Sequence, residues 1–228
     1  MERGLYIAAS GMLAELRRQD QIANDLANAA TPGYKSDRST QQSFGELLLA
    51  NNRTGQTVGR LGLGVQVDET TTDWSPQPLR QTDEPLDFAI QGEGFFAVRT
   101  GDGVFYTRNG QFTLSPQGIL TTARGDVVLG PNGAPIQVDA EGKVDPAAIG
   151  VFNVAGPRKV GDNLVAGNAA GQATGQVQAG FLEGSGADPA RSMVDMIASF
   201  RSFEATQKVV RTLDDTLALA ASKVGSLQ

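Results

Sequence analysis

Residues 5–26 read LYIAASGMLAELRRQDQIANDL, and the spacing of their apolar side chains indicates how the chain is organised. Steps of four and three residues alternate along this stretch, which is the heptad spacing of a helix that packs along one seam. Thr31-Pro32-Gly33 ends the helix, because Pro disfavours helical geometry in the residue before it and Gly supplies a turn. The predicted N-terminal seam consists of Leu5, Ala9, Met12, Leu16, Gln19, Ala23 and Leu26.

The other end of the chain carries a second seam with related spacing. Asp188 is a suitable N-cap, and Pro189 fits the first position of a helix that we expect over residues 187–228. Two consecutive three-residue steps, around Val210 and Leu213, predict local overwinding of a coiled coil at that point. The predicted C-terminal seam consists of Met193, Met196, Phe200, Phe203, Gln207, Val210, Leu213, Leu217, Ala220 and Val224.

Periodicity alone leaves two interpretations of the seams open. Isolated helices are marginally stable in water, so each seam needs a partner surface. The helices either form a hairpin packed on the chain's own β domain or are shared between subunits of an assembly. The residues expected at such a subunit interface are Leu5, Ala9, Met12, Leu16, Ala23, Leu26, Met193, Met196, Phe200, Phe203, Val210, Leu213 and Leu217.

The middle of the chain is predicted to be β structure. Turn signals recur about every 7–9 residues between residues 101 and 142, a spacing that suits short antiparallel strands. Asn109-Gly110 is the strongest hairpin signal, because both residues tolerate positive φ. Residues 155–176 are rich in Gly, Ala, Asn and Gln and are expected to form a loose arm, before a strand over residues 177–182. The other expected strands include Phe95–Val98, Val104–Thr107, Gln111–Leu114, Val127–Leu129 and Ala134–Val138.

These patterns predict an α+β fold, in which N- and C-terminal helices pair as a coiled-coil-like segment beside a central antiparallel all-β domain. Four segments are expected: an N-terminal core helix over residues 1–34, an extended connector over 35–60, a Gly-rich β domain over 61–186 and a C-terminal core helix over 187–228.

The composition excludes several classes of function. The chain contains no Cys and no His, which removes thiol chemistry, disulfides, His-based acid–base catalysis and most zinc, copper and iron sites. A net charge of -6 without a basic cluster argues against nucleic acid and anionic membranes as partners. No stretch approaches about 20 apolar residues, so we expect no membrane insertion. We therefore expect no enzyme activity, no catalytic residue, no cofactor and no metal site.

The remaining short motifs carry little chemistry. The acidic pair Asp83-Glu84 precedes Pro85 in a turn-like segment and is interpreted as solvated surface charge. Asn52-Arg53-Thr54 matches a glycosylation sequon, but residues 1–6 lack the apolar core of a secretory signal peptide. If the protein is exported, the expected route uses no cleaved signal.

The N-terminal segment resembles the signature of the bacterial flagellar rod and hook proteins. The resemblance is carried by Ser10-Gly11-Met12, by the run from Ile22 to Asn28, and by Thr31-Pro32-Gly33-Tyr34-Lys35. Asp25 stands where that family commonly has Asn.

Two further segments resemble the same family, in the expected order along the chain. Residues 85–98 and 106–112 look like its β domain, and residues 183–214 look like its closing signature. Gly186 and Ala187 replace the usual Asn-Val, and Phe203 replaces the usual Tyr.

The resemblance implies a structural subunit of the flagellar basal body. It implies helical assembly with copies of the same chain, with other flagellar rod proteins and with the hook, through terminal helices that form a tubular core and transmit torque. It further implies export through the flagellar type III apparatus, without a cleaved signal peptide.

The short chain and single β domain favour a rod subunit over a hook subunit. Among rod subunits the resemblance favours the proximal type, because distal-rod proteins tend to be longer between the N-terminal helix and the β domain. A hook or hook-associated subunit of the same export class is the first alternative. A carbohydrate-binding β protein with a helical oligomerisation stalk is the second.

Overall fold

The computed structural model describes residues 2–43, 45–50, 57–62, 64–139 and 142–225. It divides the chain into two compact units. The helical unit comprises Met1–Ala27, Asp37–Thr72 and Asp188–Gln228, and the β unit comprises Asn28–Ser36 and Asp73–Ala187. The predicted α+β fold, with terminal helices and a central antiparallel β domain, is confirmed.

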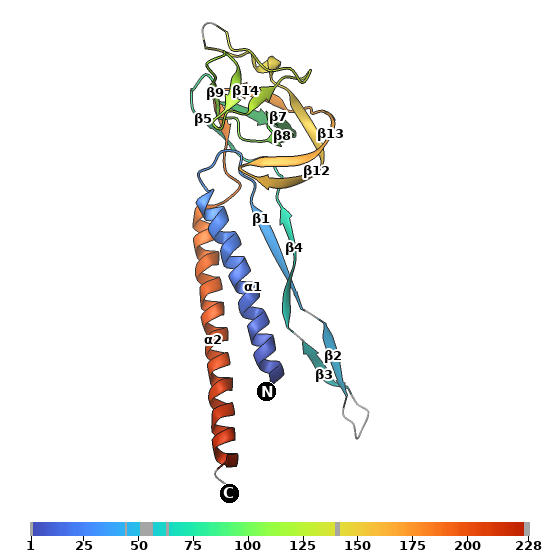
Figure 1. Cartoon of the computed structure of the whole chain (residues 1–228), viewed down its shortest axis with the longest axis vertical. Coiled ribbons are helices and arrows are strands. Elements are labelled where there is room, and N and C mark those ends of the chain that lie inside the picture. Colours follow the sequence, from blue (N-terminus) through green and yellow to red (C-terminus); the bar gives the residue numbers. More distant parts are fainter. Residues whose placement is uncertain (1, 44, 51–56, 63, 140–141, 226–228) are drawn as a thin grey trace. The chain divides into compact units, whose positions relative to one another are not determined.

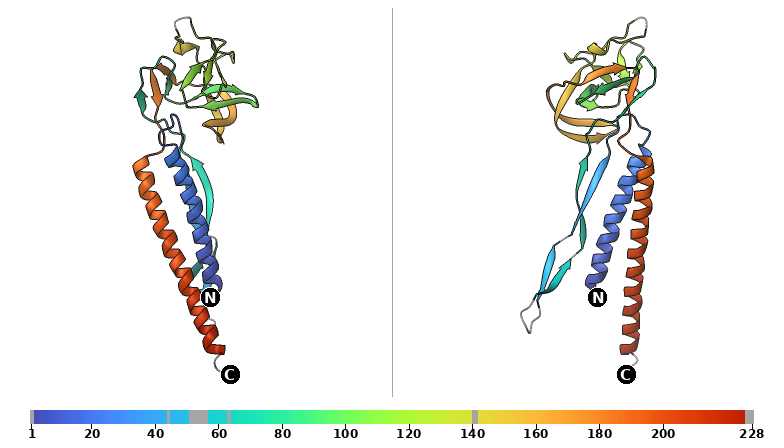
Figure 2. Two further views of the ribbon diagram at one scale, coloured as in Figure 1. Left: turned by 60° about the vertical axis from the view of Figure 1, so that its left-hand side comes forward. Right: turned by 180° about the vertical axis from the view of Figure 1, so that it is seen from behind.

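Two helices dominate the helical unit and run antiparallel, side by side, in every view (Figures 1 and 2). They are α1 (Glu2–Ala27) and α2 (Pro189–Gly225). Asp188 caps α2 as predicted, because its carboxylate accepts hydrogen bonds from the backbone N–H groups of Ala190 at 2.9 Å and Arg191 at 3.4 Å.

A long antiparallel ribbon completes the helical unit. β1 (Asp37–Ser43) pairs with β4 (Val65–Thr72), and β2 (Glu46–Ala50) pairs with β3 (Thr57–Gly62). Residues 35–60, expected as a connector, thus supply mostly the outgoing half of this ribbon. Residues 61–72, expected in the β domain, belong to its return half and to the helical unit. The predicted sequon over residues 52–54 lies outside the described residues.

The sequence did not predict the ribbon. Every residue of β1 is polar, so this strand shows no alternation between apolar and polar residues; its sequence is DRSTQQS.

The β unit contains a seven-stranded sheet with the order β12-β13-β8-β7-β11-β10-β9, and two strand pairs, β14-β6 and β15-β5. The helical turn η1 (Pro146–Ala148) precedes β12. The strands are β5 (Leu79–Gln81), β6 (Phe88–Gln91), β7 (Phe95–Thr100), β8 (Gly103–Thr107), β9 (Phe112–Leu114), β10 (Leu120–Thr122), β11 (Val127–Leu129), β12 (Val151–Gly161), β13 (Leu164–Gln172), β14 (Gln176–Ala179) and β15 (Phe181–Glu183).

Apolar side chains from distant strands form the core of the β unit. Phe88, Phe96 and Leu120 are fully buried within it. Phe96 meets Phe112 edge to face, with ring centroids 5.3 Å apart. Trp74, the only Trp of the chain, packs edge-on against Phe95 and therefore reports on this unit.

The arm expected over residues 155–176 is wrong, because most of these residues lie in β12 and β13, which pair with each other. Their small side chains lower β propensity, which hid the strands from sequence patterns. The same small residues permit the close approach: a Cβ on Gly167 would lie 2.3 Å from Cγ1 of Val154.

The hairpin predicted at Asn109-Gly110 is also wrong. The segment connects β8 to β9, which lie apart in the sheet, and the tight turn after β7 is instead at Gly101-Asp102. Gly110 is required for packing, since a Cβ there would lie 1.6 Å from the carbonyl oxygen of Phe88. The N–H of Phe88 donates to the carbonyl of Gly110 at 3.0 Å, which holds the two backbones together.

We predict that Gly110→Ala lowers the free energy of unfolding of the β unit by at least about 3 kcal/mol, because backbone must move to admit the methyl group. Gly101→Ala is the matched control: a Cβ there meets no atom within 4 Å, so its effect stays within about 0.5 kcal/mol. Urea titration followed by Trp74 fluorescence measures both, and equal midpoints would contradict the packing argument.

Candidate assembly surface

One face of α1 packs against α2 and is lined with small residues. Spacings of four and three place Gly4, Ala8, Gly11, Glu15 and Ile22 on this face. A Cβ on Gly4 would lie 3.5 Å from the Leu213 side chain, and the Ser199 hydroxyl donates to the Glu15 carboxylate at 2.5 Å. Leu213 therefore lies near Gly4 at about van der Waals distance from an added Cβ, and the polar contact joins the middle of the two helices.

A second face of α1 packs against the ribbon. The Ser10 hydroxyl accepts a hydrogen bond from the N–H of Val65 at 3.2 Å, and the Gln21 amide donates to the carbonyl of Asp37. Gly64 has φ of +132°, and a Cβ there would lie 2.5 Å from the Ser10 hydroxyl. Ala14, on the same side of the helix by spacing, is buried. Two of the three sides of α1 are therefore covered within the chain.

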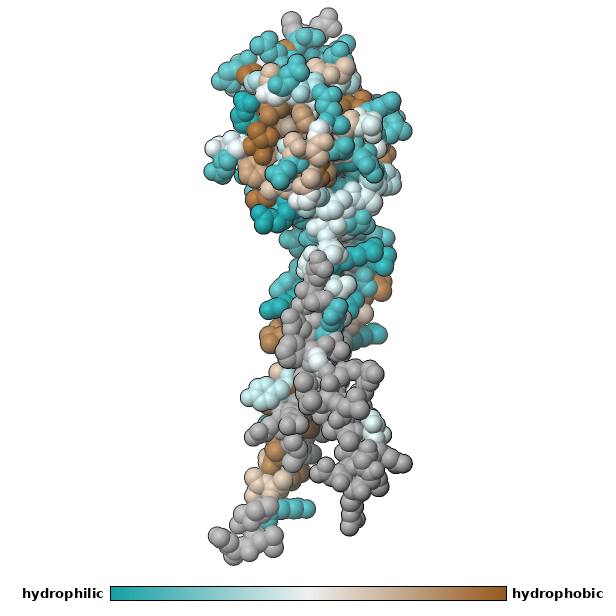
Figure 3. All heavy atoms as spheres, turned by 90° about the vertical axis from the view of Figure 1, so that its right-hand side faces the viewer, coloured by the Kyte–Doolittle hydropathy of each residue, from teal (hydrophilic) through white to brown (hydrophobic). Residues whose placement is uncertain are grey.

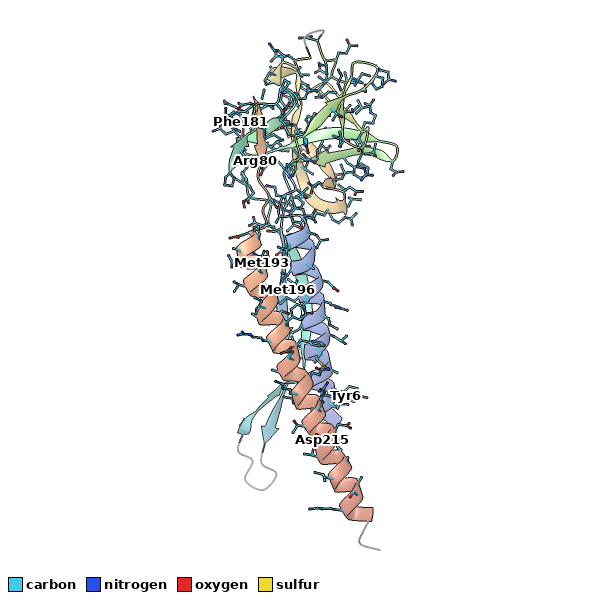
Figure 4. The ribbon with its side chains drawn as sticks, turned by 90° about the vertical axis from the view of Figure 1, so that its left-hand side faces the viewer. Tyr6, Arg80, Phe181, Met193, Met196 and Asp215 are labelled. Atoms are coloured by element: carbon cyan, nitrogen blue, oxygen red, sulfur yellow. The ribbon has the colours of Figure 1, made fainter. Side chains whose placement is uncertain are left out.

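The third face of α1 holds the seam that we expected at a subunit interface. Five of the six predicted residues of α1, all except Leu26, stand one position after a residue of the face that packs against α2. Leu5 and Leu16 are accordingly 38% and 43% exposed, Ala23 is exposed, and Ala9, Met12 and Leu26 are half-buried. Tyr6 at 75% and Leu13 at 62% exposure extend this free face. Figure 4 labels Tyr6 near the N-terminal end of α1.

The seam of α2 differs from the predicted one at four of the described positions. Met193, Phe200 and Gln207 are exposed, whereas Ser199, at 1% exposure, and Thr206 lie on the buried side. Met196, Phe203, Val210, Leu213 and Leu217 are half-buried, as expected of seam residues. Ala220 is exposed, and the Val224 side chain lies outside the described part of the chain.

The local overwinding predicted around Val210 and Leu213 is wrong, because the inward-facing residues of α2 contain no two consecutive three-residue steps. The residues that turn inward follow steps of four and three without interruption: Ser192, Met196, Ser199, Phe203, Thr206, Val210, Leu213 and Leu217. The sequence prediction missed Ser199 and Thr206 because large apolar side chains one position later, such as Phe200, set its register. The signal that could have found them is the regular spacing itself.

Exposed apolar side chains gather on the helices. Among the described residues, ten of the thirteen large exposed hydrophobic side chains belong to α1 or α2. Met193, Ile197 and Phe200 lie next to one another on α2 by spacing, at 51–54% exposure. Figure 3 shows apolar side chains at the surface of the helical unit, between hydrophilic ones. Clustered exposure of this kind marks an interaction surface.

Two further features of the described residues concern metal-ligand clusters and membrane-spanning helices. They include no cluster of three or more acidic side chains placed to hold a metal ion. Among them, neither helix has a stretch long and apolar enough to span a membrane.

Three known family profiles match separate parts of the chain. "Flagella basal body rod protein" matches residues 5–35, "Flagellar hook protein FlgE/F/G D1 domain" matches residues 89–154, and "Flagellar basal body rod FlgEFG protein C-terminal" matches residues 178–222. The first and third coincide largely with α1 and α2, and the second lies within the β unit.

Whole proteins match over nearly their full length. The chain is 34% identical to the flagellar basal-body rod protein FlgG of Bacillus subtilis, covering 95% of this chain and 97% of that protein. It is 32% identical to the flagellar basal-body rod protein FlgF of Escherichia coli, over 94% and 95%. It is 29% identical to the flagellar hook-basal body complex protein FlhO of Bacillus subtilis, over the whole of both chains.

The chain therefore belongs to the family of flagellar basal-body rod proteins that includes FlgF and FlgG. It is a structural rod subunit of the flagellar basal body, and other rod and hook components are its partners.

The three-faced arrangement of α1 predicts different outcomes for two alanines. Ala8→Leu overfills the contact with α2 and should destabilise the helix pair by about 1–3 kcal/mol. Ala23→Leu, on the exposed face, should change stability by less than about 0.5 kcal/mol in the unassembled chain. Helical circular dichroism during thermal unfolding of each purified variant tests this, and equal losses would place both alanines in the contact.

Proposed function

We propose that this chain assembles helically with copies of itself through the free faces of α1 and α2, and that the resulting rod transmits torque. The observation that carries the proposal is the third face of α1. This face is apolar, although α1 already packs against α2 and the ribbon through its two other faces.

The two free faces differ in shape in a way that suits packing against each other. The face of α1 alternates small and large residues, such as Ala9, Leu16 and Ala23, whereas the face of α2 presents Met193 and Phe200. Large side chains of one helix fit the grooves beside small residues of another. Contact between two different faces is heterologous, and such contacts propagate as a helix when they do not close into a ring.

Torque transmission follows from the number of such contacts. Each subunit contributes a helix of 26 residues and one of 37 residues. Their packed surfaces resist twisting in parallel, so no single contact carries the whole load. We infer a mechanical role without enzyme activity, in line with the names of the relatives as rod and hook-basal body proteins.

We also propose export through the flagellar type III apparatus without a cleaved signal peptide, as membership of this axial family implies.

Within the rod we propose the proximal type, because the segment between α1 and Asp73 is short and consists mostly of a single ribbon. A hook-side position is the second candidate, favoured by the similarity to a hook-basal body complex protein. A map of isolated basal bodies that locates this chain along the axis distinguishes these positions.

Leu16→Lys and Phe200→Asp should each abolish rod assembly, because a charge buried between helices of neighbouring subunits lacks a partner. Both side chains are roughly half exposed within the chain, so the β unit of each variant should unfold at the wild-type urea concentration. The measurement is the amount of rod in isolated basal bodies. These are prepared from cells in which the variant is the only copy of this protein.

Ser202→Asp is the matched control for Phe200→Asp, because Ser202 is exposed on the same helix and is not one of the apolar residues of the free face. We expect normal rods from this control. If Leu16→Lys and Phe200→Asp chains also build normal rods, the free faces are not the assembly surface.

A further inference from the structure

The chain passes between the helical unit and the β unit four times, at residues 27/28, 36/37, 72/73 and 187/188. Within the β unit, three segments flank these points: residues 28–36, 73–78 and 183–187. We call them the crossing segments. Every covalent connection between the two units lies at the end of one of these segments, so force carried along the polypeptide backbone passes through them.

Backbone hydrogen bonds tie the crossing segments to one another. The N–H of Asp73 donates to the carbonyl of Ser36 at 2.9 Å, and the N–H of Gly186 donates to the carbonyl of Tyr34 at 2.7 Å. The Ser185 hydroxyl donates to the carbonyl of Asn28 at 2.9 Å. Segments far apart in sequence are thus bonded side by side.

Glu183 lies at the centre of these ties. One carboxylate oxygen accepts from Nζ of Lys35 at 2.7 Å and from the N–H of Gln77 at 2.9 Å. The other accepts from Arg108 at 3.1 Å, and the Glu183 backbone carbonyl accepts from the N–H of Gly33 at 3.0 Å. One residue therefore holds all three crossing segments.

Arg108 connects this cluster to the core of the β unit. Its guanidinium donates to the carbonyl of Gly92 at 2.7 Å, just after β6, and lies 5.4 Å from the centroid of the Phe95 ring. Gly33 packs on the backbone of Arg108, since a Cβ there would lie 2.4 Å from its carbonyl carbon. Figure 4 labels Arg80 and Phe181, which lie on the strand pair β5 and β15 that ends at Glu183.

Burying the charged side chains of this cluster costs free energy, because they lose their contact with water. The Lys35 and Glu183 side chains are only 3% and 1% exposed. Burial lowers the pKa of Lys35 from its usual 10.5, although attraction to Glu183 raises it. Apolar side chains would fill such a space at lower cost, but they could not accept hydrogen bonds from several directions at once. The charged groups instead hold the crossing segments in one defined arrangement.

We propose that Glu183 joins the three crossing segments into one mechanical block, through which force carried by the helical unit enters the β unit. This inference rests on the proposed torque-transmitting function. Separate ties would open one after another under load, whereas the ties from Lys35, Gln77 and Gly33, which all meet at Glu183, open together or remain closed. Lys35 and Arg108 are positioning residues in this role.

Native-state hydrogen exchange of the full chain tests the block. In Lys35→Met, the amides of Gly33, Asp73, Gln77 and Gly186 should lose protection together, by about a hundredfold, because a buried carboxylate loses one of its cations. The amide of Leu120, bonded to Ile136 within the core, should keep its protection within a few-fold. Loss at one tie alone, or equal loss at Leu120, would overturn the proposal.

Two further variants keep the test decisive. Arg124→Met breaks the exposed ion pair with Asp162 and should change none of these amides. Ser185→Ala removes a neutral tie and should weaken the same four amides by about fivefold, which retains a test if Lys35→Met does not fold. An effect of Ser185→Ala confined to Gly186 would show that the ties act independently.

Swimming of cells that depend on the Lys35→Met chain tests the role in force transfer. We expect basal bodies with wild-type rod content, and slower swimming than wild type as the viscosity of the medium rises. Normal swimming under load, or complete loss of rods, would overturn the inference. The proposed function fails separately, through normal rods in Leu16→Lys and Phe200→Asp cells.

Discussion

The close pairing of the two chain ends constrains the rest of this structure. Gly4 lies against Leu213, so the chain between them must leave α1 and return to α2 at neighbouring points. The β unit meets this requirement by bonding its outgoing segment to its returning one, as Gly33 does to Glu183. The cluster around Glu183 adds side-chain bonds from Lys35 and Arg108 to this backbone connection.

Small residues let α1 contact both α2 and the ribbon while a third face stays exposed. Gly4 and Ala8 admit α2, and Ser10 and Ala14 admit the ribbon. A helix with large residues on every face would hold its neighbours too far apart for both contacts. The third face, with apolar side chains such as Leu16, remains exposed, and it is the face that we propose for contact with other subunits.

The sequence predicted the helices, the N-cap of α2 at Asp188 and the general β character of the middle. Its subunit-interface residues stay a prediction; of those on α1, Leu5, Leu16 and Ala23 are exposed. It misplaced part of the seam of α2, because Ser199 and Thr206 pack inward although they are polar. It also missed the ribbon, because β1 carries no apolar pattern, and it missed β12 and β13, because their small residues resemble a loop.

Local patterns thus determined the terminal helices, the heptad spacing and the family signatures, because each depends on residues within a few turns of one another. Tertiary structure alone decided which side of each helix is covered, since a helix rotated by one residue has the same periodicity. It also decided the strand pairings and the cluster that joins Lys35, Arg108 and Glu183. These residues lie far apart in sequence, and only the folded chain brings their charges into one buried site.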